Sequence, residues 1–166
     1  MKTLIIVESP AKAHKIQEYL GSNYVVMSSK GHITELAKGG KHGMGVDINN
    51  NFKPHYVISQ DRVQIVDDLL AAAKKCDQIL IFSDPDVEGE AIAWHLNERL
   101  KDVGKPIKRG VFSEIKKSAI QKAIKNPRDI DLNMFHAQEA RRILDRLVGF
   151  TASPFLMSFF GSSLSH

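Results

Sequence analysis

Hydrophobic and polar positions along this 166-residue chain form two kinds of pattern. Short, continuous apolar runs rich in β-branched residues are typical of strands that are buried on both faces. Such runs predict strands at 3–7, 24–27 and 78–82, and residues 108–112 suggest a further strand. Between these runs, apolar residues at helical spacing and the helix-starting pair Ser9-Pro10 predict helices at 11–20, 60–75, 89–101 and 113–125.

The order of these elements predicts the fold class. Strands and helices alternate, which favours an α/β architecture, a mostly parallel sheet flanked by helices. Residues 38–51 are rich in Gly, Lys, His and Asn without periodicity and are expected to form a surface loop. From about residue 131 the pattern is helical only. We therefore expect one domain at 1–130 and, at 131–166, a helical C-terminal extension that is the truncated start of a second domain.

Composition narrows the class of protein without identifying a function. The chain is 43% hydrophobic and 25% charged, as in ordinary globular domains. Its single cysteine, Cys76, excludes an internal disulfide framework and a cysteine-based zinc cluster, and is expected to be a small apolar residue near a helix end. Glu8 interrupts the N-terminal apolar run too early for a signal peptide or a membrane span, so a cytoplasmic protein without a membrane partner is expected. A net charge of +4 is compatible with a polyanionic partner but does not establish one.

Carboxylates concentrate directly after the strand predicted at 78–82. Asp84, Asp86 and Glu88 are spaced two residues apart between this strand and the next helix. In open parallel sheets, ligands bind outside the carboxyl ends of the strands, so the position of the segment as well as its composition predicts a site. A turn that brings three carboxylates together needs a cation, and oxygen ligands without His or Cys favour Mg²⁺ or Ca²⁺ over zinc.

Two other interpretations of this acidic segment make different demands on the sequence. A calcium-binding EF-hand loop needs Glu at its twelfth position, where this chain has His95, and a helix instead of a strand before it. That interpretation is excluded. A solvated acidic turn that caps a helix N-terminus needs no metal, and the segment alone leaves this alternative open.

Glu8 and Lys12 favour the metal interpretation. Glu8 ends the first strand, so in a parallel sheet it lies at the same edge as Asp84 and adds a fourth carboxylate there. Lys12 falls in the first turn of the following helix, where a cation and a helix N-terminus together form an anion site that fits a phosphate. An ordinary exposed lysine is the alternative. An acid, a divalent-ion cluster and a phosphate-facing cation together are the equipment of phosphoryl transfer.

Five segments resemble, in the same order, the motifs of type IA DNA topoisomerases of the bacterial topoisomerase I branch. Residues 83–96 (SDPDVEGEAIAWHL) are similar to the Asp-x-Asp-x-Glu block of the Toprim fold, a Rossmann-like α/β fold shared with primases, type II topoisomerases and some nucleases. The other matching segments are 7–13, 31–33, 111–115 and 138–149, followed by Ser153-Pro154. Where the family usually has arginine, asparagine and tryptophan, this chain has Val87, Ser113 and Met157.

The resemblance implies a role for each candidate residue. Glu8 would exchange a proton with the 3′ oxygen of the cut strand, and Lys12 would hold a non-bridging oxygen of the scissile phosphate. The ligands of Mg²⁺ would be Glu8, Asp84, Asp86 and Glu88. Contacts to single-stranded DNA would come from His32, Arg141, Arg142, Asp145 and Phe150.

A helix at 133–148 carries most of these predicted DNA contacts. Helical spacing places one set of apolar residues on one face: Ala137, Ala140, Leu144, Leu147 and Val148. Arg141, Arg142 and Asp145 share a different face. Ordinary surface ion pairs are the alternative for these charges, a structural hydrogen bond is the alternative for His32, and Phe150 fits a core position equally well.

Type IA topoisomerases cut DNA with a tyrosine, and none of the tyrosines of this chain lies in the context that the family uses. Tyr19, Tyr24 and Tyr56 fall in a helix, a strand and a loop exit. We therefore expect a part of the enzyme that binds Mg²⁺ and single-stranded DNA but does not relax DNA without the missing C-terminal domains. The uncharged, Phe-rich segment 150–160 would pack against those domains, and without them we expect it to dock on a second copy, to fold back on the α/β core or to be disordered. The alternatives are another Toprim enzyme, such as a primase or a small nuclease, and a non-catalytic DNA-binding module.

Overall fold

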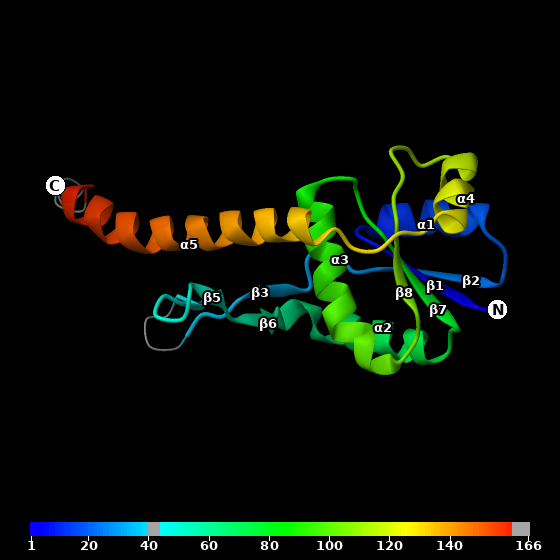
Figure 1. Cartoon of the computed structure of the whole chain (residues 1–166), viewed down its shortest axis with the longest axis horizontal. Helices are drawn as coiled ribbons and strands as arrows, with labels where there is room; N and C mark the ends of the chain where they lie inside the picture. The colour runs from blue at the N-terminus through cyan, green and yellow to red at the C-terminus, as the bar shows by residue number, and fades with distance from the viewer. Residues whose placement is uncertain (40–43, 161–166) are drawn as a thin grey trace.

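The structure is a computed structural model that describes residues 1–39 and 44–160, with side chains described as far as residue 152. At its centre is a parallel sheet with the strand order β2-β1-β7-β8. In that order the strands are Tyr24–Ser28, Thr3–Val7, Gln78–Phe82 and Ile107–Gly110. Helices α1 (Pro10–Tyr19) and α4 (Lys117–Lys125) pack on one face, and α2 (Val63–Lys74) and α3 (Val87–Leu100) pack on the other (Figure 1). The predicted α/β sheet with flanking helices is confirmed.

Strand β1 sets the position of everything at the carboxyl edge of the sheet. All five of its residues are buried, because it pairs on both sides, with β2 and with β7. The last residue of β1, Val7, lies opposite Ser28 of β2 and Phe82 of β7. The segments that follow β1 and β7 therefore leave the sheet side by side, which places Glu8 and the acidic segment at the same edge.

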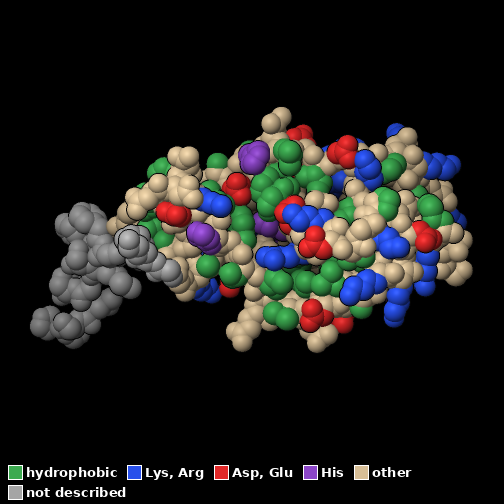
Figure 2. Space-filling view, turned by 60° about the horizontal axis from the view of Figure 1, so that its bottom comes forward, with side chains coloured by type: hydrophobic (Ala, Val, Ile, Leu, Met, Phe, Trp, Pro, Cys, Tyr) green, Lys and Arg blue, Asp and Glu red, His purple; other side chains and the backbone are tan. Residues whose placement is uncertain are grey.

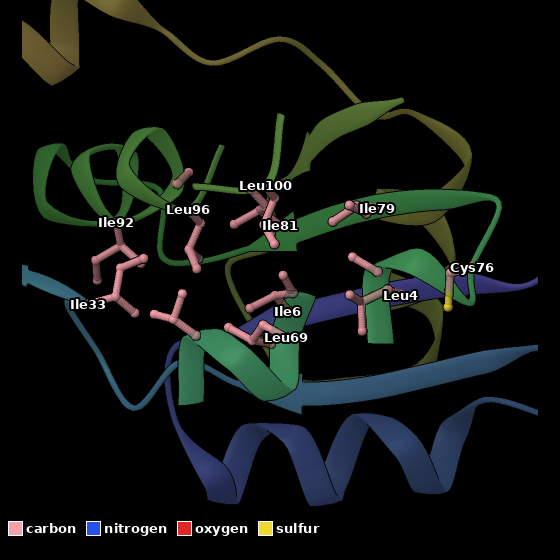
Figure 3. Close-up of a cluster of buried hydrophobic side chains, with 13 residues drawn as sticks. Leu4, Ile6, Ile33, Leu69, Cys76, Ile79, Ile81, Ile92, Leu96 and Leu100 are labelled. Atoms are coloured by element: carbon pink, nitrogen blue, oxygen red, sulfur yellow. The ribbon is translucent and has the colours of Figure 1, made fainter. Parts of the chain in front are cut away.

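Two hydrophobic layers cover the two faces of the sheet. Leu4 and Ile6 of β1 pack with α2 and α3, whereas the intervening Ile5 and Val7 pack with α1 and α4, as the alternation of side chains along a strand requires. Figure 3 shows the first layer, in which the side chains of the sheet meet those of α2 and α3. Each large side chain buried in this way stabilises the fold by about 1.5–3 kcal/mol. Cys76 lies just after α2 in the same layer, as predicted.

A hairpin that the sequence did not predict follows β2. Strands β3 (Thr34–Leu36) and β6 (Tyr56–Ile58) pair antiparallel, and β4 (Val46–Asp47) and β5 (Lys53–Pro54) pair beyond them. The predictions of a loop throughout 38–51 and of a loop exit at Tyr56 are therefore wrong in part, and residues 40–43 lie outside the described residues. Strands of two or three residues are too short to show a periodicity, and each needs a partner distant in sequence.

Helix α5 (Leu132–Phe160) extends away from the sheet, and the β3–β6 hairpin runs beside it in the same direction (Figure 1). Its first turn packs on α3, where the rings of Trp94 and Phe135 stack with centroids 4.0 Å apart. The buried positions of α5 are Phe135 and Gln138, whereas Leu144 and Val148 of the predicted apolar face are exposed. The helical extension is confirmed, and the Phe-rich side chains at 153–160 lie outside the described side chains. Within the described part of the chain, no helix has the length and hydrophobicity to cross a membrane.

Two predicted boundaries move because of local contacts. The strand expected at 108–112 ends at Gly110, whose position against the ring of Phe82 leaves no room for a Cβ, which would lie 1.9 Å from that ring. The helix expected at 113–125 begins only at Lys117. Short 3₁₀ turns, Gln60–Arg62 and Lys101–Val103, precede α2 and follow α3.

Candidate functional site

The acidic segment leaves β7 and turns directly into α3. Asp86 is the N-cap of α3, and its Oδ1 accepts a hydrogen bond from Gly89 N at 2.7 Å. Gly89 packs against the turn itself, since a Cβ there would lie 2.1 Å from Asp84 O. Ser83 Oγ closes the turn by donating to Gly89 O at 2.6 Å. The helix-capping interpretation is therefore correct for Asp86, whereas the side chain of Asp84 bonds to a different element.

Lys12 joins the ends of β1 and β7. Its Nζ donates to Asp84 Oδ1 at 2.6 Å and also pairs with Glu8 Oε1. The helix that carries Lys12 begins at Pro10 and is capped by Ser9, whose Oγ accepts from Lys12 N at 3.3 Å. The structure thus brings Glu8, Lys12 and Asp84 together at the edge where the parallel register places them.

These contacts favour the charged forms of both partners. Burial opposes the charge of Lys12, but hydrogen bonds to Asp84 and Glu8 outweigh this effect and raise the pKa of the ammonium. The hydrogen bond from Lys12 lowers the pKa of Asp84 below its usual value. Figure 2 shows acidic, basic and histidine side chains next to one another in the middle of the face that it presents. Opposite charges at the carboxyl edge therefore compensate each other directly.

Glu88 turns toward α5 and the loop that follows β2. His32 Nε2 pairs with Glu88 Oε1, and Gln138 Nε2 of α5 donates to Glu88 Oε2 at 3.1 Å. The loop of His32 is tied to the end of β1, because Gly31 N donates to Glu8 O at 2.7 Å, and Gly31 has a φ of 86° that favours glycine. Burial opposes the charge of Glu88, yet the hydrogen bond from His32 prevails and lowers its pKa. His32 therefore makes the structural hydrogen bond that was the alternative to a DNA contact, and its partner is Glu88 of the acidic segment.

The predicted metal ligands fit a divalent cation by their chemistry more than by their arrangement. They lie at one edge of the sheet and offer only the oxygen atoms that Mg²⁺ prefers: Glu8, Asp84, Asp86 and Glu88. Among the residues described, however, no three His, Cys, Asp or Glu side chains are close enough to hold one ion together. The expected convergence of the three acids is not present, because Asp86 caps α3 and Glu88 faces α5. Glu8 and Asp84 are the pair that can receive a cation in place of the Lys12 ammonium.

A buried ion-pair network, which the sequence did not predict, lies beneath the acidic segment. Glu90 and Arg109 have fully buried side chains, and Arg109 Nε donates to Glu90 Oε2 at 2.8 Å. Arg109 Nη2 also donates to Asp84 O at 2.7 Å, so β8 holds the backbone from which Asp84 projects. Arg128 adds hydrogen bonds to both oxygens of Glu90, at 3.0 and 2.8 Å. The only signals in the sequence are a fourth acid in the segment and an arginine inside a predicted strand.

The charged residues of α5 divide between two environments. Arg142 Nη2 donates to Thr34 O of the hairpin at 2.9 Å, and its guanidinium lies 5.5 Å from the centre of the Tyr56 ring. Arg142 is thus half-buried, whereas Arg141 and Asp145 are exposed. The two arginines do not share one face: Arg142 contacts the hairpin, whereas Arg141 faces solvent.

A groove of about 670 Å³ lies between β3 and the second half of α5. It is lined by Leu36, Lys38, Arg142, Asp145, Arg146, Gly149 and Phe150. Phe150 is 41% exposed, so the core alternative for this residue is wrong. Arg146 is a basic groove residue that the sequence analysis missed, although its spacing of one helical turn from Arg142 was a signal. The groove combines three basic side chains with an aromatic ring.

Comparison with known proteins gives consistent matches. Residues 3–115 match the family model described as the Toprim domain. The chain is 46% identical to DNA topoisomerase 1 of Mycolicibacterium smegmatis over 176 aligned residues, which cover 99% of this chain and 19% of that protein. The structure of full-length topoisomerase I from Thermotoga maritima matches with a TM-score of 0.83 and 46% identity, over 93% of this chain and 26% of that one. The chain spans about a fifth of the length of the curated relative.

These matches distinguish between the alternatives that the acidic segment alone leaves open. The sequence identity of 46% is to type I topoisomerases, and it extends over α5 as well as the sheet. Neither a primase, a small nuclease nor a separate DNA-binding module is favoured by such a match. The chain is therefore homologous to the N-terminal region of type IA topoisomerase I and belongs to the Toprim domain family.

Proposed function

We propose that this chain is the part of a type IA DNA topoisomerase that holds a divalent cation and a single-stranded segment of DNA. In this proposal residues 1–130 form the domain that handles the metal and the phosphate, and 131–166 begin the helical DNA-binding domain. The observation that carries the proposal is the position of Lys12, an ammonium held between Glu8 and Asp84 at the ends of two adjacent parallel strands. An anion that enters there meets a cation, an acid and a helix N-terminus together.

Glu8 and Lys12 supply the proton and the positive charge in this scheme. Lys12 Nζ exchanges its carboxylate partners for a non-bridging oxygen of the phosphate and stabilises the charge that develops on it. Glu8, released from Lys12, takes up a proton from water, passes it to the 3′ oxygen when the strand is cut and takes it back when the strand is resealed. The short reach from Lys12 to both carboxylates allows this exchange to occur by side-chain rotation alone.

The carboxylates at the same edge would hold Mg²⁺. Asp84 would bind it after Lys12 turns to the phosphate, and Glu8 would join it when its carboxyl group is ionised. Asp86 and Glu88 would support it from the N-cap and the first turn of α3. When bound there, Mg²⁺ supplies positive charge that orients phosphate oxygens. The backbone of this segment is fixed by Arg109, so the ligands project from a rigid support.

Single-stranded DNA would follow the groove between the hairpin and α5. Arg142 and Arg146 give the groove its positive wall, and Phe150 offers an aromatic surface for a base. Asp145, which lines the same groove, would orient the arginines when DNA is bound. Arg141, which is exposed, would reach the backbone from outside the groove. His32 would contact DNA only after it leaves Glu88.

The chain alone is proposed to bind DNA without relaxing it. The three tyrosines lie away from Lys12, in α1, β2 and β6, namely Tyr19, Tyr24 and Tyr56. Tyr19 Oη donates to Ile115 O at 3.5 Å, and Tyr56 is covered by Arg142. The attacking tyrosine would therefore be supplied by the rest of the enzyme, as would the partner domains that complete the DNA path.

Binding of a fluorescent single-stranded oligonucleotide to the 166-residue chain, followed by anisotropy at several salt concentrations, tests this function. We expect Lys12→Met and Arg142→Met each to weaken binding several-fold and to lower the salt dependence by about one phosphate contact. Lys125→Met, at the exposed end of α4, is the matched control and should bind as the unchanged chain does. A Lys12→Met/Arg142→Met double variant that melts normally and binds with unchanged affinity would contradict the proposal.

A further inference from the structure

Gln138 links the acidic segment to helix α5. Its Nε2 donates to Glu88 Oε2 at 3.1 Å, across 50 residues of sequence. The side chain of Gln138 is enclosed, with only 7% of the residue exposed, and its Oε1 has no protein partner. Among the described residues, Glu88 therefore accepts the one hydrogen bond that this buried amide makes, and removal of that acceptor leaves both of its polar groups unsatisfied.

Buried polar atoms without a protein partner gather around this contact. Of the seven such side-chain atoms among the described residues, six belong to the hairpin and its approach, to α3 and to α5. They are His32 Nδ1, Thr34 Oγ1, Tyr56 Oη, His95 Nε2, Gln138 Oε1 and Arg142 Nη1, and we call this set the polar junction. A polar network that is only partly satisfied has donors and acceptors to spare. The polar junction therefore holds donors and acceptors that are not used in this structure, several of them on α5 itself or in contact with it.

The contacts that hold α5 differ on the two sides of Gln138. Before Gln138, the helix is anchored to α3 by the stacked rings of Trp94 and Phe135 and by Asp131 N, which donates to the buried Glu90 at 2.7 Å. Beyond Gln138, the contacts of α5 with the hairpin are polar: Arg142 donates to Thr34 O and lies over the ring of Tyr56, and Glu139 lies beside Tyr56. The groove begins there. Gln138 lies at the transition between the anchored and the groove-forming part of the helix.

We propose that Gln138 is a positioning residue that couples a divalent cation at the acidic edge to the binding of a single-stranded polyanion in the groove. This inference rests on the proposed function. A cation at the edge draws the Glu88 carboxylate away from Gln138 and His32. The amide then loses its acceptor, which is unfavourable for a buried polar group and favours a new position of α5 that uses the polar junction. The groove beyond Gln138 is released and adapts to the strand, so cation and polyanion strengthen each other's binding.

The experiment compares Gln138→Met with Gln121→Met in the 166-residue chain. Methionine keeps the length of the side chain and removes both polar groups, and Gln121 is an exposed glutamine of α4 that serves as the control. Oligonucleotide affinity is measured by anisotropy with and without Mg²⁺ at matched ionic strength. We expect Mg²⁺ to tighten binding at least about fivefold in the unchanged chain and in Gln121→Met, and by less than about twofold in Gln138→Met.

Hydrogen exchange without DNA separates this mechanism from a cation that merely bridges protein and phosphate. In the unchanged chain, Mg²⁺ is expected to speed amide exchange in residues 138–149, and Gln138→Met is expected to show no such response. Should the unchanged chain bind both ligands without coupling, or Gln138→Met keep the full coupling, the role of Gln138 is overturned while the proposed function stands. A chain that binds neither Mg²⁺ nor the oligonucleotide overturns the proposed function, and this inference with it.

Discussion

Lys12 Nζ lies 2.6 Å from Asp84 Oδ1, although 72 residues separate the two along the chain. The contact exists because β1 and β7 are adjacent and parallel, with Val7 opposite Phe82 at their carboxyl ends. In the proposed function Lys12 binds the phosphate and Asp84 binds the metal, and here these two side chains bind each other. In the chain without ligands, these charges are compensated internally, and any ligand has to compete with that pairing.

Competition from Lys12 should make Mg²⁺ binding weak in the absence of DNA, with a dissociation constant of roughly 10⁻⁴–10⁻³ M. Lys12→Met removes the competitor and leaves Glu8 and Asp84 facing each other, so we expect the variant to bind Mg²⁺ about tenfold more tightly, a gain of about 1.4 kcal/mol. Chemical shifts of amides 84–90 during a Mg²⁺ titration measure both constants.

Two further variants check the metal assignment. Lys15→Met, on the exposed side of α1, should leave the Mg²⁺ affinity unchanged. Asp84→Asn combined with Asp86→Asn should abolish the shift changes at 84–90. If the changes persist in that double variant, the ion binds elsewhere and the metal assignment is wrong.

Glu90→Gln is expected to be among the most destabilising single substitutions in the chain. It leaves the guanidinium of Arg109 buried without a full counter-charge, a situation that typically costs about 3–5 kcal/mol. Urea unfolding at neutral pH measures the loss. Glu114→Gln, which removes only an exposed pair with Lys116, should change the free energy of unfolding by less than about 1 kcal/mol. Equal costs for the two variants would show that the buried network contributes little.

His95 should make the stability of the fold sensitive to mild acid. Burial lowers its pKa to about 3, and Arg142 and His32 act in the same direction. Its folded pKa is therefore below that of an unfolded histidine, about 6.5, so the unfolded chain binds the extra proton first. The stabilisation is complete above about pH 6.5 and is lost as the pH falls toward the folded value, by up to about 1.4 kcal/mol per pH unit.

Urea unfolding at a series of pH values between about 5 and 7 measures this slope. In that window most carboxyl groups are still ionised, so the histidine contribution is separated from acid denaturation. His95→Gln should flatten the dependence on pH, and His14→Gln, whose side chain is 83% exposed, should leave it as in the unchanged chain. A slope that survives in His95→Gln would assign it to another group.

Incubation with supercoiled DNA and Mg²⁺ should give neither relaxation nor a covalent protein–DNA adduct. Burial raises the pKa of Tyr56, and Tyr19 is bonded to the backbone of Ile115, so neither phenol is placed as a nucleophile beside Lys12. Denaturation followed by gel electrophoresis detects an adduct. An adduct that disappears in Tyr19→Phe, Tyr24→Phe or Tyr56→Phe would place the nucleophile inside this chain and contradict the proposal.

The sheet and its flanking helices were predictable because their signals are local and strong. The β-branched runs at 3–7 and 78–82 need burial on both faces, and the pair Ser9-Pro10 is a local start signal for α1. The hairpin was not predictable in the same way. Strands of two and three residues carry almost no periodicity, and β3 becomes a strand only when β6, some twenty residues later, pairs with it.

The candidate site also combines features that were predictable from local sequence with features that were not. That Glu8 and Asp84 lie at the carboxyl edge was predictable, because each follows a buried strand of a parallel sheet, and Lys12 falls in the first turn of the helix that begins at Pro10. What each carboxylate does there depends on contacts that arise on folding: Asp84 bonds to Lys12, Asp86 caps α3, and Glu88 bonds to α5. The physical reason is that partners such as Gln138 and Arg109 come from elements distant in sequence, and burial forces their polar groups to pair with the acids that folding brings within reach.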